Sequence, residues 1–169
     1  MDCLTGLRTV ALAFRVAGVT RMFSTPNRIA LTTALMSRER FLMHQGQVRT
    51  GVDRLEMVLG VVDNDLARDA ALHRFEGLTD GTWELMRLYL MHQGHKCATD
   101  RDMLRHAFLD GLITTSQEAD AWGRMREDRQ RLGRAHDDDI SAGVFDQIRT
   151  TYAPLLRTMA GRVEGLTWD

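Results

Sequence analysis

Apolar side chains recur at intervals of three and four residues through most of this chain, in five stretches divided by short polar segments. This spacing matches the turn of an α-helix and not the two-residue alternation of a half-buried strand. Only two prolines occur and aromatic residues make up 7% of the chain, which favours helices over a β-sandwich or barrel. We therefore predict an all-α fold, an antiparallel bundle of four or five helices.

The expected helices begin near residues 37, 66, 99, 116 and 137. Ser116 is the expected N-cap of the fourth helix, and Pro154 should kink or restart the last one. Gly77 and Gly81 lie inside the second helix, which indicates a kink there or the close approach of another helix. The third helix should turn four apolar side chains inward, namely Met103, Leu104, Ala107 and Phe108.

Residues 1–35 differ from the rest, because four arginines stand among apolar residues with Asp2 as the only acid. This composition is typical of a targeting segment, and it also fits a mis-assigned start codon before Met36, which is the interpretation we adopt. We expect residues 36–169 to form the folded domain. This is a length that suits one compact core.

The net charge of −1 gives the chain no global attraction to nucleic acid, so contact with RNA requires a local patch. No apolar run is long enough to span a bilayer. The two cysteines, Cys3 and Cys97, lie far apart, which suggests a reducing compartment and a cytoplasmic protein. We expect no cofactor.

Trp122–Asp139 is the stretch with the most chemical content, because five arginines precede a histidine and three aspartates in it. Arginine matches phosphate oxygens with a planar charged fork, and histidine exchanges a proton near neutral pH. Arginines on an exposed helix are more often a solvated face, so this stretch alone does not establish a phosphate site. The arginines are Arg124, Arg126, Arg129, Arg131 and Arg134, and the histidine is His136.

The order Trp122, Met125, Asp128, Arg129 and Gln130, followed by His136, resembles the signature of HEPN-domain proteins. The similar branch is the nucleotidyltransferase substrate-binding, or HEPN-toxin, branch. Two upstream blocks, Leu66–Glu76 and Asp102–Ile113, resemble the same branch in the same order. The likeness extends over roughly residues 40 to 160.

The resemblance implies a homodimer that places two Arg/His pairs in a shared basic cleft, and a nucleotidyltransferase partner. Active members are metal-independent endoribonucleases. His136 would exchange protons with the ribose hydroxyl or the leaving oxygen, and Arg129 would stabilise charge on the phosphate. Arg131 is the alternative catalytic arginine, and Arg126 and Arg134 are the expected RNA-binding residues.

The sequence departs from the branch in three ways. Six residues separate Arg129 from His136 where four are commoner, a spacing that Arg131 would satisfy. Gln130 replaces an asparagine, and Asp138 stands where some members carry a tyrosine that the partner modifies with AMP. Arg129 shares a helix face with Trp122, and it shares one with His136 only if the helix continues past the intervening glycine.

Two other clusters allow alternative interpretations. Glu76 and Asp80 lie one turn apart, and they serve either acid–base chemistry or an ion pair with Arg74 or Arg87. A metal site is the less favoured interpretation of three side chains near a helix end, because their spacing is loose: His92, His95 and Cys97.

Three functions remain open from the sequence. They are a HEPN ribonuclease toxin paired with a nucleotidyltransferase antitoxin, a non-catalytic subunit that binds the nucleotidyltransferase, and a helical bundle retained for assembly alone.

Overall fold

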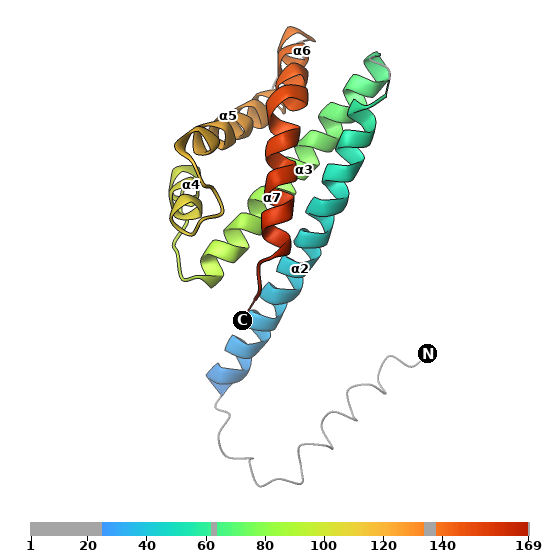
Figure 1. Cartoon of the computed structure of the whole chain (residues 1–169). Helices are drawn as coiled ribbons and strands as arrows, with labels where there is room; N and C mark the ends of the chain where they lie inside the picture. Colours follow the sequence, from blue (N-terminus) through green and yellow to red (C-terminus); the bar gives the residue numbers. More distant parts are fainter. Residues whose placement is uncertain (1–24, 62–63, 134–137, 169) are drawn as a thin grey trace, which may run out of the picture. The chain divides into compact units, whose positions relative to one another are not determined.

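The structure, a computed structural model, describes residues 25–61, 64–133 and 138–168 (Figure 1). Contacts between Cα atoms divide the chain into two units, Met1–Ser37 and Arg38–Asp169, and the second unit forms the helical bundle. The described residues contain helices and no strand, so the predicted all-α fold is confirmed. The elements are α2 (Thr25–Leu59), α3 (Asp65–His92), α4 (Asp100–Leu109), α5 (Ser116–Leu132), α6 (Asp138–Gln147), the π-helical η1 (Ile148–Tyr152) and α7 (Ala153–Glu164).

Helix α2 begins at Thr25, well before the expected start near residue 37. No glycine or proline occurs between Asn27 and Gln45, so nothing in that segment ends a helix. No helix in the part of the chain that the structure describes is both long and apolar enough to cross a membrane.

Side-chain caps fix the start of three helices. Asn64 accepts a hydrogen bond from the Ala67 amide at the start of α3, and Thr99 forms a capping box with Asp102 at the start of α4. The N-cap of α5 is Thr115, so the prediction of Ser116 is wrong by one residue. Thr115 has the extended backbone that lets its hydroxyl reach the helix, whereas Ser116 already belongs to α5.

Pro154 restarts the last helix as predicted. It stands at the beginning of α7, after the five-residue π-helical turn η1. Proline has no amide hydrogen to donate, and the Ala153 amide before it donates to the carbonyl of Ile148, five residues back.

Apolar residues from every helix of the second unit pack together in the core of the bundle. Trp83 of α3 and Trp122 of α5 approach with ring centroids 6.2 Å apart, and Phe75 stacks on Tyr152 at 5.6 Å. The prediction that Phe108 turns inward is wrong, because 45% of this residue is exposed. The ten residues of α4 present a narrow face to the core, and that face is already filled by its other apolar side chains.

Helix α3 has two differently used sides. Helices α4 and α5 pack against one side, and α2 runs along another (Figure 1). The expectation that a helix approaches Gly77 and Gly81 closely is wrong, because a Cβ atom added at either position would meet no atom within 4 Å among the described residues. The close approach lies at Gly51 of α2, where an added Cβ atom would stand 2.8 Å from Cδ1 of Leu78.

Candidate functional site

Helix α5 turns one apolar face toward α3 and sets its arginines at the edge of that contact. Trp122 and Met125 are fully buried, and the same face continues to Arg129, whose side chain is 25% exposed. This agrees with the three- and four-residue spacing, which predicts Arg129 at the inner edge of the bundle.

Arg129 is held by two carboxylates of α3. Its Nε and Nη2 atoms donate to Oδ2 of Asp80 at 3.1 and 2.7 Å, and Nη1 lies 3.2 Å from Oε1 of Glu76. The expected partners Arg74 and Arg87 are therefore wrong for this carboxylate pair, and Arg87 bonds Glu84 instead. The spacing within α3 shows only which residues are near Glu76 and Asp80 in sequence. Their partner, Arg129, comes from α5.

Arg126 shares Asp80 with Arg129. Its Nη1 donates to Oδ1 of Asp80 at 2.9 Å, and its Nε lies 3.4 Å from Oδ2 of Asp100. The guanidinium carbon also lies 5.2 Å from the ring centroid of Trp83, at a distance where cation–π attraction operates. The predicted RNA-binding residue Arg126 is thus a link between α3, α5 and the start of α4.

Arg131 projects from a different side of α5. Its Nη1 donates to Oδ1 of Asp128 at 3.1 Å, and its side chain is 59% exposed. The other carboxylate oxygen of Asp128 accepts a 2.6 Å hydrogen bond from the hydroxyl of Tyr152. Burial of Tyr152, together with this bond to a negative group, raises the pKa of the tyrosine well above its ordinary value.

The predicted site residues His136 and Arg134 lie outside the described residues. Helix α5 ends at Leu132 with Gly133 as its C-cap. Whether Arg129 and His136 share a face stays a prediction, because His136 lies outside the part of the chain that the structure describes.

The described part of the site is a network in which carboxylates oppose the positive charges. The sequence did not indicate that Asp100 and Tyr152 belong to this network. Asp100 is the first residue of α4, and Tyr152 is one of the buried residues of η1. An approaching phosphate group would compete with these carboxylates for the guanidinium groups. The network therefore orients arginine side chains and joins α3, α4, α5 and η1.

Within the described ranges, no group of three or more His, Cys, Asp or Glu side chains is arranged to hold a metal ion. Instead, Nε2 of His95 lies 2.9 Å from the carboxylate of Asp110, and the ring of His92 stacks on Trp168 at 4.0 Å. These contacts give both histidines near Cys97 a structural role.

The family described as "Nucleotidyltransferase substrate binding protein like" matches residues 31–164 of this chain. The search of curated proteins found no match to this chain. A protein of known crystal structure from Thermus thermophilus shares 24% identity with a TM-score of 0.62, covering 69% of this chain and 98% of its own. The toxin–antitoxin MntA-HpeT, solved as a mutant, shares 10% identity with a TM-score of 0.62, covering 76% and 99% of the two chains. At these identities the two likenesses show the fold.

Proposed function

We propose, on the premise that this chain belongs to the nucleotidyltransferase substrate binding protein like family, that it is the helical partner of a nucleotidyltransferase. We further propose that the two proteins form a toxin–antitoxin pair, in which this chain is a HEPN-type, metal-independent endoribonuclease. The family match supports the partner, since it includes nearly the whole bundle. The fold shared with the toxin–antitoxin MntA-HpeT supports the proposal that the two proteins form a toxin–antitoxin pair.

The observation that carries the enzymatic proposal is the placement of Arg129. It stands in the last turn of α5, partly exposed, and Glu76 and Asp80 fix the direction of its guanidinium group. An arginine held in this way is preorganised to stabilise charge that develops on a phosphate in the transition state. His136, seven positions later in the sequence, supplies the proton exchange that cleavage next to a ribose 2′-hydroxyl requires.

A second candidate function is a non-catalytic subunit that binds the nucleotidyltransferase. The pairing of all three described arginines of this network with carboxylates favours it. In that case Arg126, Arg129 and Arg131 stabilise the fold, and the protein contributes a surface to its partner.

Expression toxicity tests the proposal. The chain expressed alone should arrest growth, and co-expression with its nucleotidyltransferase should restore it. His136→Ala should remove the toxicity while the protein still co-purifies with the nucleotidyltransferase. A harmless wild-type chain that co-purifies in the same way would support the non-catalytic function instead.

We also propose a homodimer, with the segment from Arg129 to His136 at the interface. Light scattering at micromolar concentration should give the mass of two chains. A monomer would exclude a cleft that two Arg/His pairs share.

A further inference from the structure

Helix α4 turns one face away from the bundle. The helix packs against α3 and α5 (Figure 1), and its buried residues are Met103 and Ala107. At 3.6 residues per turn, four side chains point away from these two, and all four are exposed. These residues, the outward face of α4, are Arg101, Arg105, Phe108 and Leu109.

The outward face of α4 leaves two large apolar side chains in water. Phe108 is 45% exposed and Leu109 is 68% exposed, whereas Phe41, Phe75 and Phe145 are buried. Phe108 and Leu109 follow each other at the end of the helix, so they form one apolar patch there. Exposed apolar side chains grouped in this way are typical of a surface that another molecule covers.

The positive charges of the outward face of α4 are available to a partner. Arg101 forms no ion pair or hydrogen bond with a residue that the structure describes. The hydrogen bond of Arg105 to a described residue is a long one, 3.5 Å from its Nη2 atom to Nε2 of His106. Lys96, in the loop before α4, is also exposed and pairs with no described residue.

The acidic residues of the same segment already have partners. Asp100 accepts a hydrogen bond from Nε1 of Trp83 at 3.2 Å, and Asp110 lies 2.9 Å from Nε2 of His95. The carboxylate of Asp102 caps the start of α4. The outward face of α4 therefore attracts negative groups of another molecule, because its own acids are bound elsewhere.

The combination of charge and apolar area indicates the kind of partner. Carboxylates of a partner would orient it on the two arginines, which lie one turn apart, and apolar side chains would supply the contact with the patch. A single strand of nucleic acid would use the arginines and the ring of Phe108, but it offers Leu109 no apolar counterpart. The ten residues of α4 span about 15 Å, a length that suits a short peptide segment.

We propose that the outward face of α4 binds a short, acidic, amphipathic segment of another protein. Carboxylates of that segment pair with Arg101 and Arg105, and its apolar side chains cover Phe108 and Leu109. The proposal does not depend on RNA cleavage, because none of these residues belongs to the network of α5.

Selection from a random library of peptides of about 12 residues, with the immobilised full chain as the target, tests the proposal. The selected peptides should combine Asp and Glu with Leu, Phe or Trp. Fluorescence anisotropy of a labelled selected peptide then measures its affinity. A library that yields no binder, or binders without enrichment in acidic residues, would overturn the proposal.

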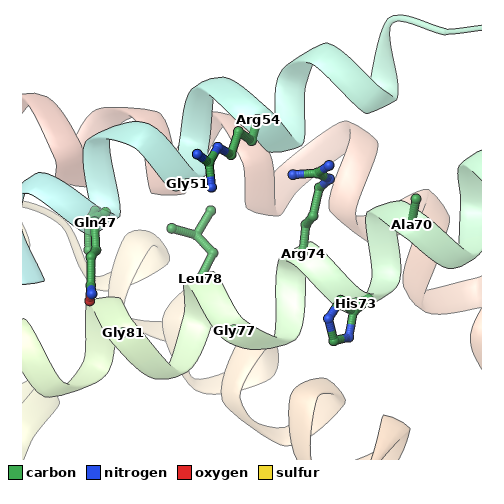
Figure 2. Close-up of a pocket in the computed structure, with 10 residues that line it drawn as sticks. Gln47, Gly51, Arg54, Ala70, His73, Arg74, Gly77, Leu78 and Gly81 are labelled. Carbon is green, nitrogen blue, oxygen red and sulfur yellow. The ribbon is translucent and has the colours of Figure 1, made fainter.

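Variants of the chain locate the binding surface. The double change Arg101→Glu and Arg105→Glu should weaken peptide binding at least tenfold, and Leu109→Ser at least threefold. Two controls should leave the affinity unchanged: Arg54→Glu, at the groove between α2 and α3 (Figure 2), and Met57→Ser, at a 71% exposed position of α2. Circular dichroism should show all four proteins folded.

Three further results would assign the outward face of α4 to a different partner and overturn the proposal. The first is a single-stranded RNA of about 12 nucleotides that displaces the peptide with comparable affinity. The second is a dimer of the chain that Leu109→Ser dissociates. The third is a nucleotidyltransferase that co-purifies with the wild type and not with Leu109→Ser. Equal affinity of the peptide for the wild type and the double variant would also contradict it.

Discussion

Two arginine groups of this protein lie along different faces of α3, and they differ in what surrounds them. On the α5 side of α3, Arg126 and Arg129 contact carboxylates and an aromatic ring. On the α2 side, Arg54 and Arg74 line a groove whose lining contains no acid. The comparison shows that a count of arginines does not locate a phosphate site, because the partners of each guanidinium group decide its availability.

The difference also separates two contributions of arginine. A paired, half-buried arginine links elements of the fold and keeps one orientation, which suits a group that acts on a developing charge. An unpaired arginine at the edge of a groove adds little to stability, and its charge is free for a ligand. The same residue type therefore links helices on one side of α3 and lines a groove without acidic side chains on the other.

The largest expected effect lies where α5 meets the last helices. Tyr152→Phe removes the hydrogen bond to the largely buried Asp128, and we expect the free energy of unfolding to fall by about 1.5 to 3 kcal/mol. Tyr89→Phe is the matched control, since no hydrogen bond of the Tyr89 hydroxyl to a described residue is present. Urea denaturation measures both, and equal losses would show that the Tyr152–Asp128 bond adds nothing.

Smaller losses should distinguish the two arginine groups directly. Asp80→Asn removes the negative charge that pairs with Arg126 and Arg129. We expect the free energy of unfolding to fall by about 1 kcal/mol, because the ion pairs are only partly buried. Arg74→Ala should change stability by less than about 0.5 kcal/mol, because Arg74 is exposed and has no ion pair or hydrogen bond with a described residue. Comparable losses in the two variants would contradict the division into structural and available arginines.

A second paired carboxylate of α5, Glu118, should make stability depend on pH, and the groove should not, because its lining contains no acidic side chain. Burial opposes ionisation of Glu118, but hydrogen bonds from the Thr114 amide and from Arg162 outweigh it and lower the pKa of the carboxyl group. Its contribution to stability is therefore present above the ordinary glutamate pKa, about 4.3, and is lost as the pH falls through the lower folded value.

Thermal unfolding from pH 6 to 2 should show this dependence. Glu118→Gln should lower stability at pH 6 and make its decline in acid shallower, whereas Arg74→Ala should retain the wild-type decline. A Glu118→Gln protein with the same decline as the wild type would exclude Glu118 as a source of acid sensitivity.

The glycine variants should give a small gain in stability. Gly77→Ala should raise the free energy of unfolding by about 0.5 to 1 kcal/mol, because alanine favours the helix and its methyl group meets no described atom. Gly51→Ala should gain less, since its Cβ atom would press on Leu78. If both changes give the same gain, the open and the close-packed glycines do not differ as the structure indicates.

Local patterns in the sequence were sufficient for the fold. The three- and four-residue apolar spacing predicted the helices, and Pro154 predicted the restart before α7, because both signals act within one or two helical turns. Thr115 was missed as the cap of α5 because neighbouring hydroxyl residues carry the same local signal.

The site was predictable only in part, because its pairs join helices that are distant in sequence. The spacing placed Arg129 beside Trp122 and Met125 correctly, yet it could not show that Glu76 and Asp80 face α5. The groove at Arg54 and Arg74 was missed for the same reason, since its two sides come from separate helices. Gly77 and Gly81 were the only local signal of it.

RNA cleavage in excess EDTA by variants of one purified chain tests the central claim most directly. The wild type should cut single-stranded RNA and leave a 2′,3′-cyclic phosphate, and Arg131→Ala should keep most of this activity. Arg129→Ala and His136→Ala should each lose activity by about 100-fold or more, while stability changes by no more than about 1 kcal/mol. A dead Arg131→Ala beside an active Arg129→Ala would assign catalysis to the other arginine, and full activity in the His136→Ala protein would contradict the Arg/His mechanism.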